Sequence, residues 1–246
     1  MACFGILQTN TMTIDAVFID LDDTIWNFTA NSAGSLKYTF DTFNISRWCS
    51  CYDEFVEQYS FKNNEMWELY HYGKTDKVTL GIERFKYPLL KQGCGLPENE
   101  LVELCLKMNQ FYLEYLATLK ELVPGAKDLL VYLKSKYKVG ILSNGFKGIQ
   151  QQKLKSAGVE EYIDLYVLSD EVGVTKPLRG IFDCALKCWN TAAENTVMIG
   201  DNYDADVCGA HNAGWKTIFF NRKGVEIENP VADYTVATLS EIKQIL

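Results

Sequence analysis

An unbroken apolar run near the start of the chain predicts its first structural element. Residues 16–19 are Ala, Val, Phe and Ile, and the carboxylates of Asp20, Asp22 and Asp23 follow at once. Such a run, with β-branched and aromatic members, is typical of a strand that is covered on both faces of a sheet. A carboxylate at the end of a buried strand needs a compensating cation, so the stretch indicates a metal or other cation site. The simpler alternative is that Asp22 and Asp23 only open a turn.

A helical spacing of apolar residues follows, with no strand pattern until about residue 120. In the third predicted helix, Pro88 indicates a kink or an early end. In the fourth, Pro97 occupies the first helical position, and Glu98 and Glu100 lie in the first turn, where negative charge is favourable. The four predicted helices span residues 29–43, 51–72, 79–90 and 97–122.

After Pro124 and Gly125 the pattern changes to short apolar runs that alternate with helical stretches. Alternating strands and helices imply a parallel sheet with right-handed crossovers. The predicted fold is therefore α/β, a Rossmann-like three-layer core with a parallel sheet of five or more strands. The further strands are predicted at 139–142, 165–168, 196–199 and 217–220, and the helices at 126–136, 148–157, 181–188, 206–213 and 239–246.

Polar residues follow the predicted strands, at the edge where parallel sheets bind their ligands. The intervals between Ser143, Lys176 and Asp201 match one strand–helix–strand repeat, whereas the interval from Asp20 to Ser143 exceeds it by about 90 residues. These additional residues match the length of the predicted helical segment. We therefore predict a catalytic core of residues 1–27 and 121–246, with a helical cap of residues 28–120 inserted after the first strand, where it can close over the site.

The composition narrows the classes of function. The net charge of −8 argues against a nucleic-acid surface, so an anionic substrate must meet a metal ion or single placed cations. No apolar run reaches the length of a membrane span, and the first basic residue is Lys37, so a secretory signal is not expected. The chain is expected in the cytoplasm, with its eight cysteines reduced and most of them buried, and with a weakly ordered lead-in before Met12.

The residues at the strand ends resemble the haloacid dehalogenase superfamily, in particular phosphatases whose helical cap lies between the first and second motifs. The resemblance covers residues 14–225 and includes four motifs in order. These are D-x-D-x-T at residues 20–24, the serine motif at Ser143, the lysine motif at Lys176 and Pro177, and G-D-x-x-x-x-D from Gly200 to Asp206.

The resemblance implies a role for each of these residues. Asp20 is the nucleophile that forms an aspartyl-phosphate, and Asp22 is the general acid and base. Mg²⁺ is the implied cofactor, with Asp20, Asp201 and the backbone carbonyl of Asp22 as ligands, because Mg²⁺ prefers oxygen donors. Asp206 is expected to hold the metal's water shell or Lys176. The phosphate-binding residues implied are Thr24, Ser143, Asn144, Gly145 and Lys176, and Thr24 is also expected to fix the loop and orient an aspartate.

The implied activity is phosphomonoester hydrolysis, because dehalogenases of this superfamily lack the aspartate at position 22 and the metal. The stretches DLDDTIWNFTANS and GAHNAGWKTIFFN, with the aromatic cap residues around His71, are similar to a group of pyrimidine 5'-nucleotidases. Phosphoglycolate, a sugar phosphate or flavin mononucleotide fits the same motifs. Another class of function is a catalytically silent binding or scaffold protein, which the intact motifs disfavour. The expected partner is a small phosphate ester, and the chain is expected to be a monomer or homodimer.

Overall fold

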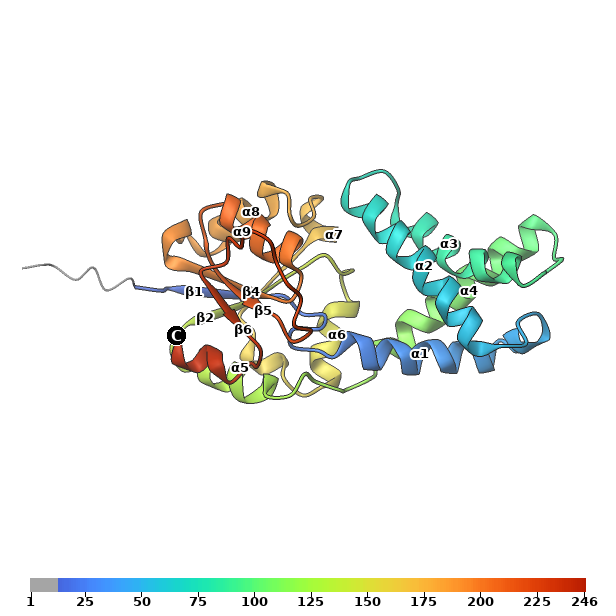
Figure 1. Ribbon diagram of the computed structural model, residues 1–246, viewed down its shortest axis with the longest axis horizontal. Coiled ribbons are helices and arrows are strands. Elements are labelled where there is room, and N and C mark those ends of the chain that lie inside the picture. The colour runs from blue at the N-terminus through green and yellow to red at the C-terminus, as the bar shows by residue number, and fades with distance from the viewer. Residues whose placement is uncertain (1–12) are drawn as a thin grey trace, which may run out of the picture.

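The computed structural model describes residues 13–246, and its centre is a six-stranded, fully parallel sheet (Figure 1). The strand order is β3-β2-β1-β4-β5-β6, so β1 lies between β2 and β4. The predicted α/β fold with a parallel sheet of five or more strands is confirmed, while the lead-in before Met12 lies outside the described residues. The strands are β1 (Ala16–Ile19), β2 (Lys138–Ser143), β3 (Leu165–Leu168), β4 (Thr196–Gly200), β5 (Lys216–Phe220) and β6 (Tyr234–Val236).

Helices cover both faces of the sheet and give the core its three layers (Figure 1). The side chains of β1 alternate between two apolar clusters, as the pleat of a strand requires. Val17 and Ile19 join the cluster that contains α5 and α6, whereas Phe18 joins the cluster that contains α8 and α9. These elements are α5 (Ala126–Lys134), α6 (Ile149–Ser156), α7 (Ser169–Val172), α8 (Arg179–Trp189) and α9 (Gly209–Asn212), with short η2 (Glu160–Tyr162), η3 (Ala193–Asn195), η4 (Tyr203–Cys208) and η5 (Glu241–Gln244).

The helical segment between β1 and α5 forms a separate lobe beside the carboxyl end of the sheet (Figure 1). The chain passes into the lobe and back at adjacent points, because the backbone N–H of Asn27 donates to the carbonyl of Glu121 at 3.0 Å. A second hydrogen bond joins their side chains at 2.8 Å. The lobe consists of α1 (Phe28–Thr42), η1 (Ile45–Arg47), α2 (Tyr52–His71), α3 (Lys77–Lys91) and α4 (Glu98–Leu116).

Three predictions about helix ends in this lobe are wrong. The fourth helix ends at Leu116 and not at residue 122, because the chain turns at Leu119 and returns to pair Leu122 with Trp26 in a β-bridge. Pro97 is the residue before the helix, with extended backbone angles, and is not its first helical residue. Pro88 lies inside α3, which continues beyond it to Lys91, so an early end of that helix is also wrong.

The C-terminal part of the core also departs from the predicted elements. The helix predicted over 206–213 is split into the π-helical η4 and the short α9, and the terminal helix is reduced to the single turn η5. Strand β6 was not predicted, because it has only three residues and two of them are exposed. Asp233 fixes the position of the chain just before β6, because its carboxylate accepts hydrogen bonds from the N–H and the hydroxyl of Thr217 at 2.9 and 3.1 Å.

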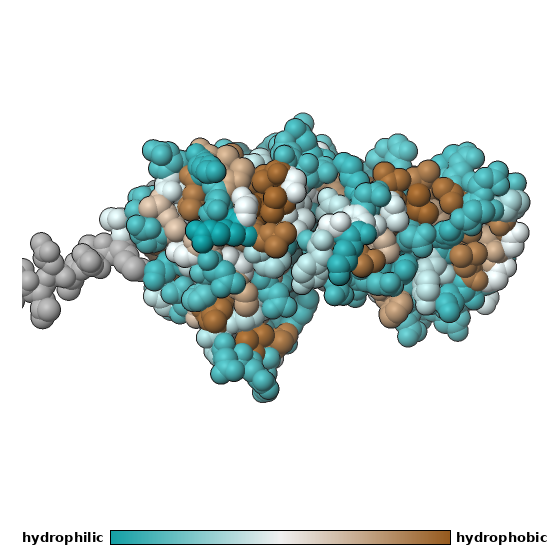
Figure 2. All heavy atoms as spheres, turned by 90° about the horizontal axis from the view of Figure 1, so that it is seen from above, coloured by the Kyte–Doolittle hydropathy of each residue, from teal (hydrophilic) through white to brown (hydrophobic). Residues whose placement is uncertain are grey.

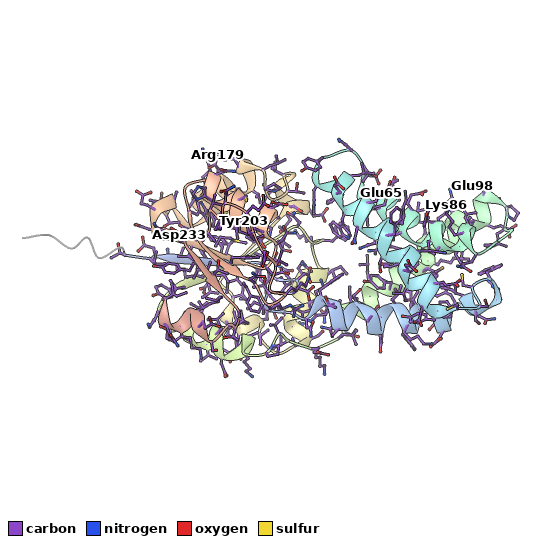
Figure 3. The ribbon with its side chains drawn as sticks, in the orientation of Figure 1. Glu65, Lys86, Glu98, Arg179, Tyr203 and Asp233 are labelled. Atoms are coloured by element: carbon purple, nitrogen blue, oxygen red, sulfur yellow. The ribbon has the colours of Figure 1, made fainter. Side chains whose placement is uncertain are left out.

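The surface is mostly hydrophilic, with apolar patches over both lobes (Figure 2). In the helical lobe, Lys86 and Glu98 form an ion pair of 2.5 Å at the end away from the sheet (Figure 3). In the described part of the chain, no helix combines the length and apolar character that a membrane crossing requires. The seven cysteines of that part are free, but only Cys49, Cys94 and Cys105 are buried, so the prediction that most cysteines are buried is wrong.

A substitution of Gly140 in β2 tests the packing between the sheet and α8. A Cβ atom at this position would lie 2.7 Å from Cε1 of Phe18 and 2.9 Å from Cη2 of Trp189. We expect Gly140→Ala to lower the free energy of unfolding by about 1–3 kcal/mol, the usual effect of overpacking a core. In the control Gly34→Ala, the new Cβ lies 3.8 Å from Leu119 within an exposed part of α1, so a gain of about 0.5–1 kcal/mol is expected. Urea unfolding of both variants measures the two opposite changes.

Candidate active site

The carboxyl ends of the strands bring together three residues that are far apart in the sequence. Lys176, in the loop between α7 and α8, is buried, and its Nζ donates to Oδ1 of Asp20 and to Oδ1 of Asp206, each at 2.6 Å. It also donates to the carbonyl of Leu142 in β2 at 2.7 Å. Burial alone would lower the pKa of Lys176, but the two carboxylates raise it, so this side chain is a fixed positive charge.

The carboxylates of Asp20, Asp201 and Asp206 form a compact acidic cluster, with one oxygen of each within 4.8 Å of the others. Burial raises the pKa of Asp20 well above its ordinary value, against the opposing effect of Lys176, and the neighbouring aspartates add to the rise. Burial and the charge of Asp206 raise the pKa of Asp201 to about 7. One lysine therefore leaves the cluster short of positive charge, and an oxygen-preferring cation such as Mg²⁺ fits its donors.

Asp206 supports the cluster, because both of its oxygens already have partners. Its Oδ1 accepts from Lys176, and its Oδ2 accepts from the backbone N–H of Asn202 at 3.0 Å. A Cβ on Gly200 would lie 2.1 Å from that Oδ2, so only glycine allows this approach. Asp20 and Asp201 keep oxygens free for a cation, which agrees with the prediction that Asp206 holds Lys176.

Thr24 lies next to Asp201 in the candidate site. Its hydroxyl donates to Oδ1 of Asp201 at 3.3 Å, and the residue has no exposed surface. Thr24 was predicted both to orient an aspartate and to bind phosphate, and this contact favours the first role, with Asp201 as the aspartate. The two residues are 177 positions apart, so only the pairing of β1 with β4 brings them together.

The predicted phosphate loop follows β2. Oγ of Ser143 accepts from the N–H of Gly145 at 3.1 Å and from Nε2 of Gln150 at 2.7 Å, so its own proton is left to donate elsewhere. The side chain of Asn144 holds the lysine loop, because it donates to the carbonyl of Lys176 at 3.0 Å and accepts from its N–H at 2.8 Å. The loop is thus tied both to α6 and to the buried lysine.

Two residues of α6 at the site were missed by sequence reasoning. Nζ of Lys153 lies 2.7 Å from Oδ1 of Asp22, and Nε2 of Gln150 donates to Oδ2 of Asp22 at 2.8 Å. Both α6 side chains are buried, Gln150 at 0% exposure and Lys153 at 3%. Their spacing of three residues on one helix face was the available signal, but the sequence does not show that this face meets Asp22.

Asp23 has a structural role at the start of the helical lobe. Its carboxylate accepts from the N–H and hydroxyl of Thr29 at 3.0 and 2.7 Å, in the first turn of α1, and pairs with Arg222 at 2.6 Å. Its backbone has φ of 62°, a left-handed conformation that Asp tolerates better than most residues. Asp23 therefore fixes the start of the helical lobe.

A second contact between the helical lobe and the core lies next to Lys176. The hydroxyl of Thr175 donates to the carbonyl of His71 at 2.7 Å, and burial and the charge of Lys176 lower the pKa of His71. Trp67 stacks on Phe146 with ring centroids 5.4 Å apart. The lobe thus meets the core at a second place, apart from the crossing at Asn27 and Glu121.

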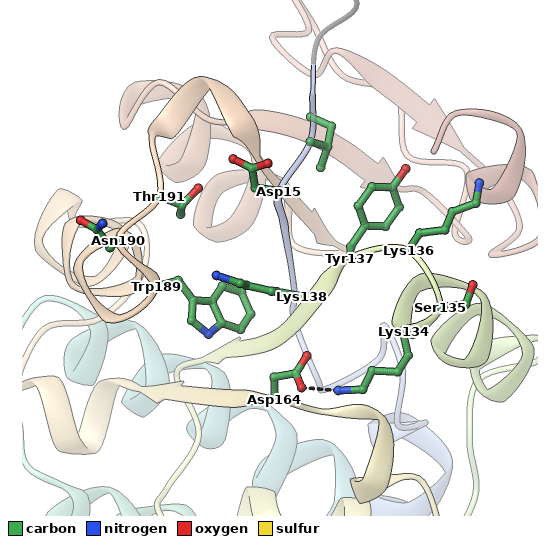
Figure 4. Close-up of a pocket in the computed structure, with 11 residues that line it drawn as sticks. Asp15, Lys134, Ser135, Lys136, Tyr137, Lys138, Asp164, Trp189, Asn190 and Thr191 are labelled. Atoms are coloured by element: carbon green, nitrogen blue, oxygen red, sulfur yellow. Dashed lines mark hydrogen bonds and ion pairs between the residues drawn. The ribbon is translucent and has the colours of Figure 1, made fainter.

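A shallow cavity of about 740 Å³ lies elsewhere, at the amino-terminal edge of the sheet (Figure 4). It is lined by charged residues of mixed sign, with Asp164 paired to Lys134 and with Lys138 and Trp189 nearby. Because ligands of open α/β sheets bind at the carboxyl ends of strands, this cavity is not the candidate site.

The comparisons with known proteins agree with the geometry. The model of the haloacid dehalogenase-like hydrolase family matches residues 14–214. Pyrimidine 5'-nucleotidase YjjG of Escherichia coli (strain K12) is 32% identical over 237 residues, which cover 96% of this chain and 99% of that protein. A glyceraldehyde 3-phosphate phosphatase of Methanothermobacter thermautotrophicus is 38% identical over 130 residues, which cover 50% of this chain and 58% of that protein.

The fold of the chain is also similar to solved structures. The HAD-hydrolase YfnB of Bacillus subtilis, bound to magnesium, superposes with a TM-score of 0.85 at 26% sequence identity. The match covers 95% of this chain and 99% of that chain, and so includes both the sheet and the helical lobe.

Proposed function

Since this chain belongs to the haloacid dehalogenase-like hydrolases and is a phosphatase of that family, we propose that it is a Mg²⁺-dependent 5'-nucleotidase of pyrimidine nucleoside monophosphates. The observation that carries the chemistry is the cluster in which Lys176 bridges Asp20 and Asp206 beside Asp201. The similarity to YjjG along nearly the whole chain supports the substrate class.

In the proposed reaction, Asp20 is the nucleophile and its carboxylate oxygen forms a bond to phosphorus while the ester bond breaks. Asp22 gives a proton to the leaving alcohol, then takes one from the water that hydrolyses the aspartyl-phosphate and releases inorganic phosphate. Asp20, Asp201 and the backbone carbonyl of Asp22 would hold Mg²⁺, which would supply the positive charge that lets the carboxylate of Asp20 and the phosphate anion approach each other. Lys176 adds a positive charge that the carboxylates of Asp20 and Asp206 maintain against the effect of burial.

The loop after β2 is proposed to hold the transferring phosphoryl group. The free hydroxyl proton of Ser143 and the N–H group of Asn144 are donors of the kind that stabilise phosphoryl oxygens, whereas the N–H of Gly145 donates to Oγ of Ser143 and holds that oxygen in place. The helical segment of residues 28–120 is proposed to act as a cap over residues 1–27 and 121–246. Its contacts with the core at the chain crossing and next to Lys176 support this division.

A second substrate class rests on a separate observation. The similarity to the glyceraldehyde 3-phosphate phosphatase is higher, 38%, but covers half of this chain. A small sugar phosphate is therefore the second candidate, to be separated from nucleotides by experiment.

Phosphate release from a panel of esters tests the proposal. We expect the highest kcat/KM for UMP, CMP and dTMP, lower values for AMP, glyceraldehyde 3-phosphate, phosphoglycolate and flavin mononucleotide, and a loss of roughly a hundredfold or more in EDTA that Mg²⁺ restores. The loss is expected because the cluster of Asp20, Asp201 and Asp206 needs a cation before a phosphate anion can approach it. If pyrimidine nucleotides are among the poorest substrates, the proposed substrate class is wrong but the proposed phosphatase chemistry is not. No release from any ester would indicate a silent binding protein.

A further inference from the structure

The carboxylate of Asp22 is held from one side by the buried face of α6. Both of its oxygens are engaged, Oδ1 by Nζ of Lys153 at 2.7 Å and Oδ2 by Nε2 of Gln150 at 2.8 Å. A carboxylate only accepts hydrogen bonds, so the donor end of the Gln150 amide must face it. The side chain of Asp22 is itself 30% exposed toward the site and would otherwise be free to rotate.

Lys153 is fixed independently of Asp22. Its Nζ lies 4.6 Å from the ring centroid of Trp26 and 5.4 Å from that of Phe28, and a cation over such rings is attracted to them. Trp26 is fully buried, and its indole N–H donates to the carbonyl of Leu119 at 3.3 Å. These aromatic residues belong to the crossing between core and helical lobe, so the position of the ammonium group is tied to that crossing.

Gln150 is fixed as well, and it joins Asp22 to the phosphate loop. Its Nε2 donates to Oγ of Ser143 at 2.7 Å, in addition to its bond with Asp22. A Cβ on Gly145 would lie 2.2 Å from this nitrogen, so the glycine leaves the space that the amide fills. One buried side chain thus relates the orientation of Asp22 to that of the loop.

From these contacts we propose that Lys153 is a positioning residue for proton transfer: it orients the carboxylate of Asp22 toward the leaving-group oxygen. The proposal rests on the proposed function, since it requires Asp22 to be the general acid. Lys153 acts through Asp22 and does not itself touch the reacting atoms. The ring of Trp26 and the buried surroundings of Lys153 hold its ammonium group in position.

The dependence of kcat/KM on the leaving group tests this role. An alkyl ester such as UMP needs a proton on its leaving oxygen, whereas p-nitrophenolate leaves without one, and kcat/KM excludes the later hydrolysis of the aspartyl-phosphate. We expect Lys153→Met to lower kcat/KM for UMP by roughly 10–100-fold and for p-nitrophenyl phosphate by less than about threefold. Lys153→Arg, which keeps the charge, should recover part of the loss.

Three controls separate the outcomes. Lys155→Met, on the exposed face of the same helix, should leave both values unchanged. Asp22→Asn should show the same split with a larger loss, and adding Lys153→Met to it should bring no further loss, because coupled residues are not additive. The double variant removes the charges of Asp22 and Lys153 together, so neither is left without its partner. It can therefore be measured even if Lys153→Met alone does not fold.

Each result decides a different statement. An equal loss for both esters in Lys153→Met, or a further loss in the double variant, overturns the positioning role of Lys153. An Asp22→Asn variant without the split overturns the general-acid assignment, and the role of Lys153 with it. A wild-type protein that hydrolyses neither ester overturns the proposed function as well.

Discussion

Replacing Asp20 with Asn should lower kcat for p-nitrophenyl phosphate by roughly a thousandfold or more, because an amide cannot form the aspartyl-phosphate. The fold should survive the change. Lys176 keeps its bond to Asp206 at 2.6 Å, and burial together with neighbouring carboxylates already raises the pKa of Asp20, so its charge is costly in the folded state. Without Mg²⁺ the melting temperature should stay the same or rise.

The matched control for this variant is Asp204→Asn. Asp204 lies between Asp201 and Asp206 in the sequence but is exposed, so its loss should leave kcat within about twofold of the wild type, as surface substitutions usually do. Phosphate release and thermal unfolding are measured for both proteins. Full activity in Asp20→Asn would contradict the nucleophile assignment, and Asp20→Ala checks that residual activity is not due to deamidation of the new Asn.

Replacing Lys176 with Met should lower both stability and turnover. Its Nζ bridges Asp20 and Asp206, whose side chains are 12% and 1% exposed, and removing one partner of a buried ion pair costs about 3–5 kcal/mol. A fall in kcat of roughly 100-fold or more is expected, since the proposed reaction brings negative charge up to Asp20, which Lys176 contacts at 2.6 Å. Urea unfolding and phosphate release measure the two effects.

Lys216→Met is the matched control for Lys176→Met. Lys216 pairs with Asp233 at 3.4 Å, and both side chains are about one-third exposed, at 33% and 30%. Solvent screens such a pair, so the expected loss is about 1 kcal/mol or less, with no change in kcat. If the two variants are equally stable, then the bridge of Lys176 does not hold the strand ends together.

The parts of the fold that follow from local pattern were predictable. The run at residues 16–19 identified β1 because a strand covered on both faces must be apolar throughout, and these residues have no exposed surface. The three-residue β6 was not predictable, because it pairs on one edge and its place depends on Asp233 contacting Thr217. The end of α4 was misplaced because the β-bridge between Trp26 and Leu122 replaces its last turn.

The residues of the candidate site likewise divide into those that the sequence predicted and those that it did not. Asp20, Ser143, Lys176 and Asp201 were found because a parallel sheet brings the residues after its strands to one edge. The contacts of Lys153 and Gln150 with Asp22 were not found, because they span 131 and 128 positions and depend on which face of α6 turns inward.

The sequence by itself therefore determined the kinds of element, their order and the residues at the strand ends, since all of these follow from local periodicity and from the geometry of parallel sheets. The tertiary structure alone decided how each carboxylate is held. Asp206 is bound by Lys176 and by the N–H of Asn202, whereas Asp22 is bound from α6. Hydrogen bonds between distant segments depend on packing at the scale of tenths of an ångström, and that packing leaves no periodic signal in the chain.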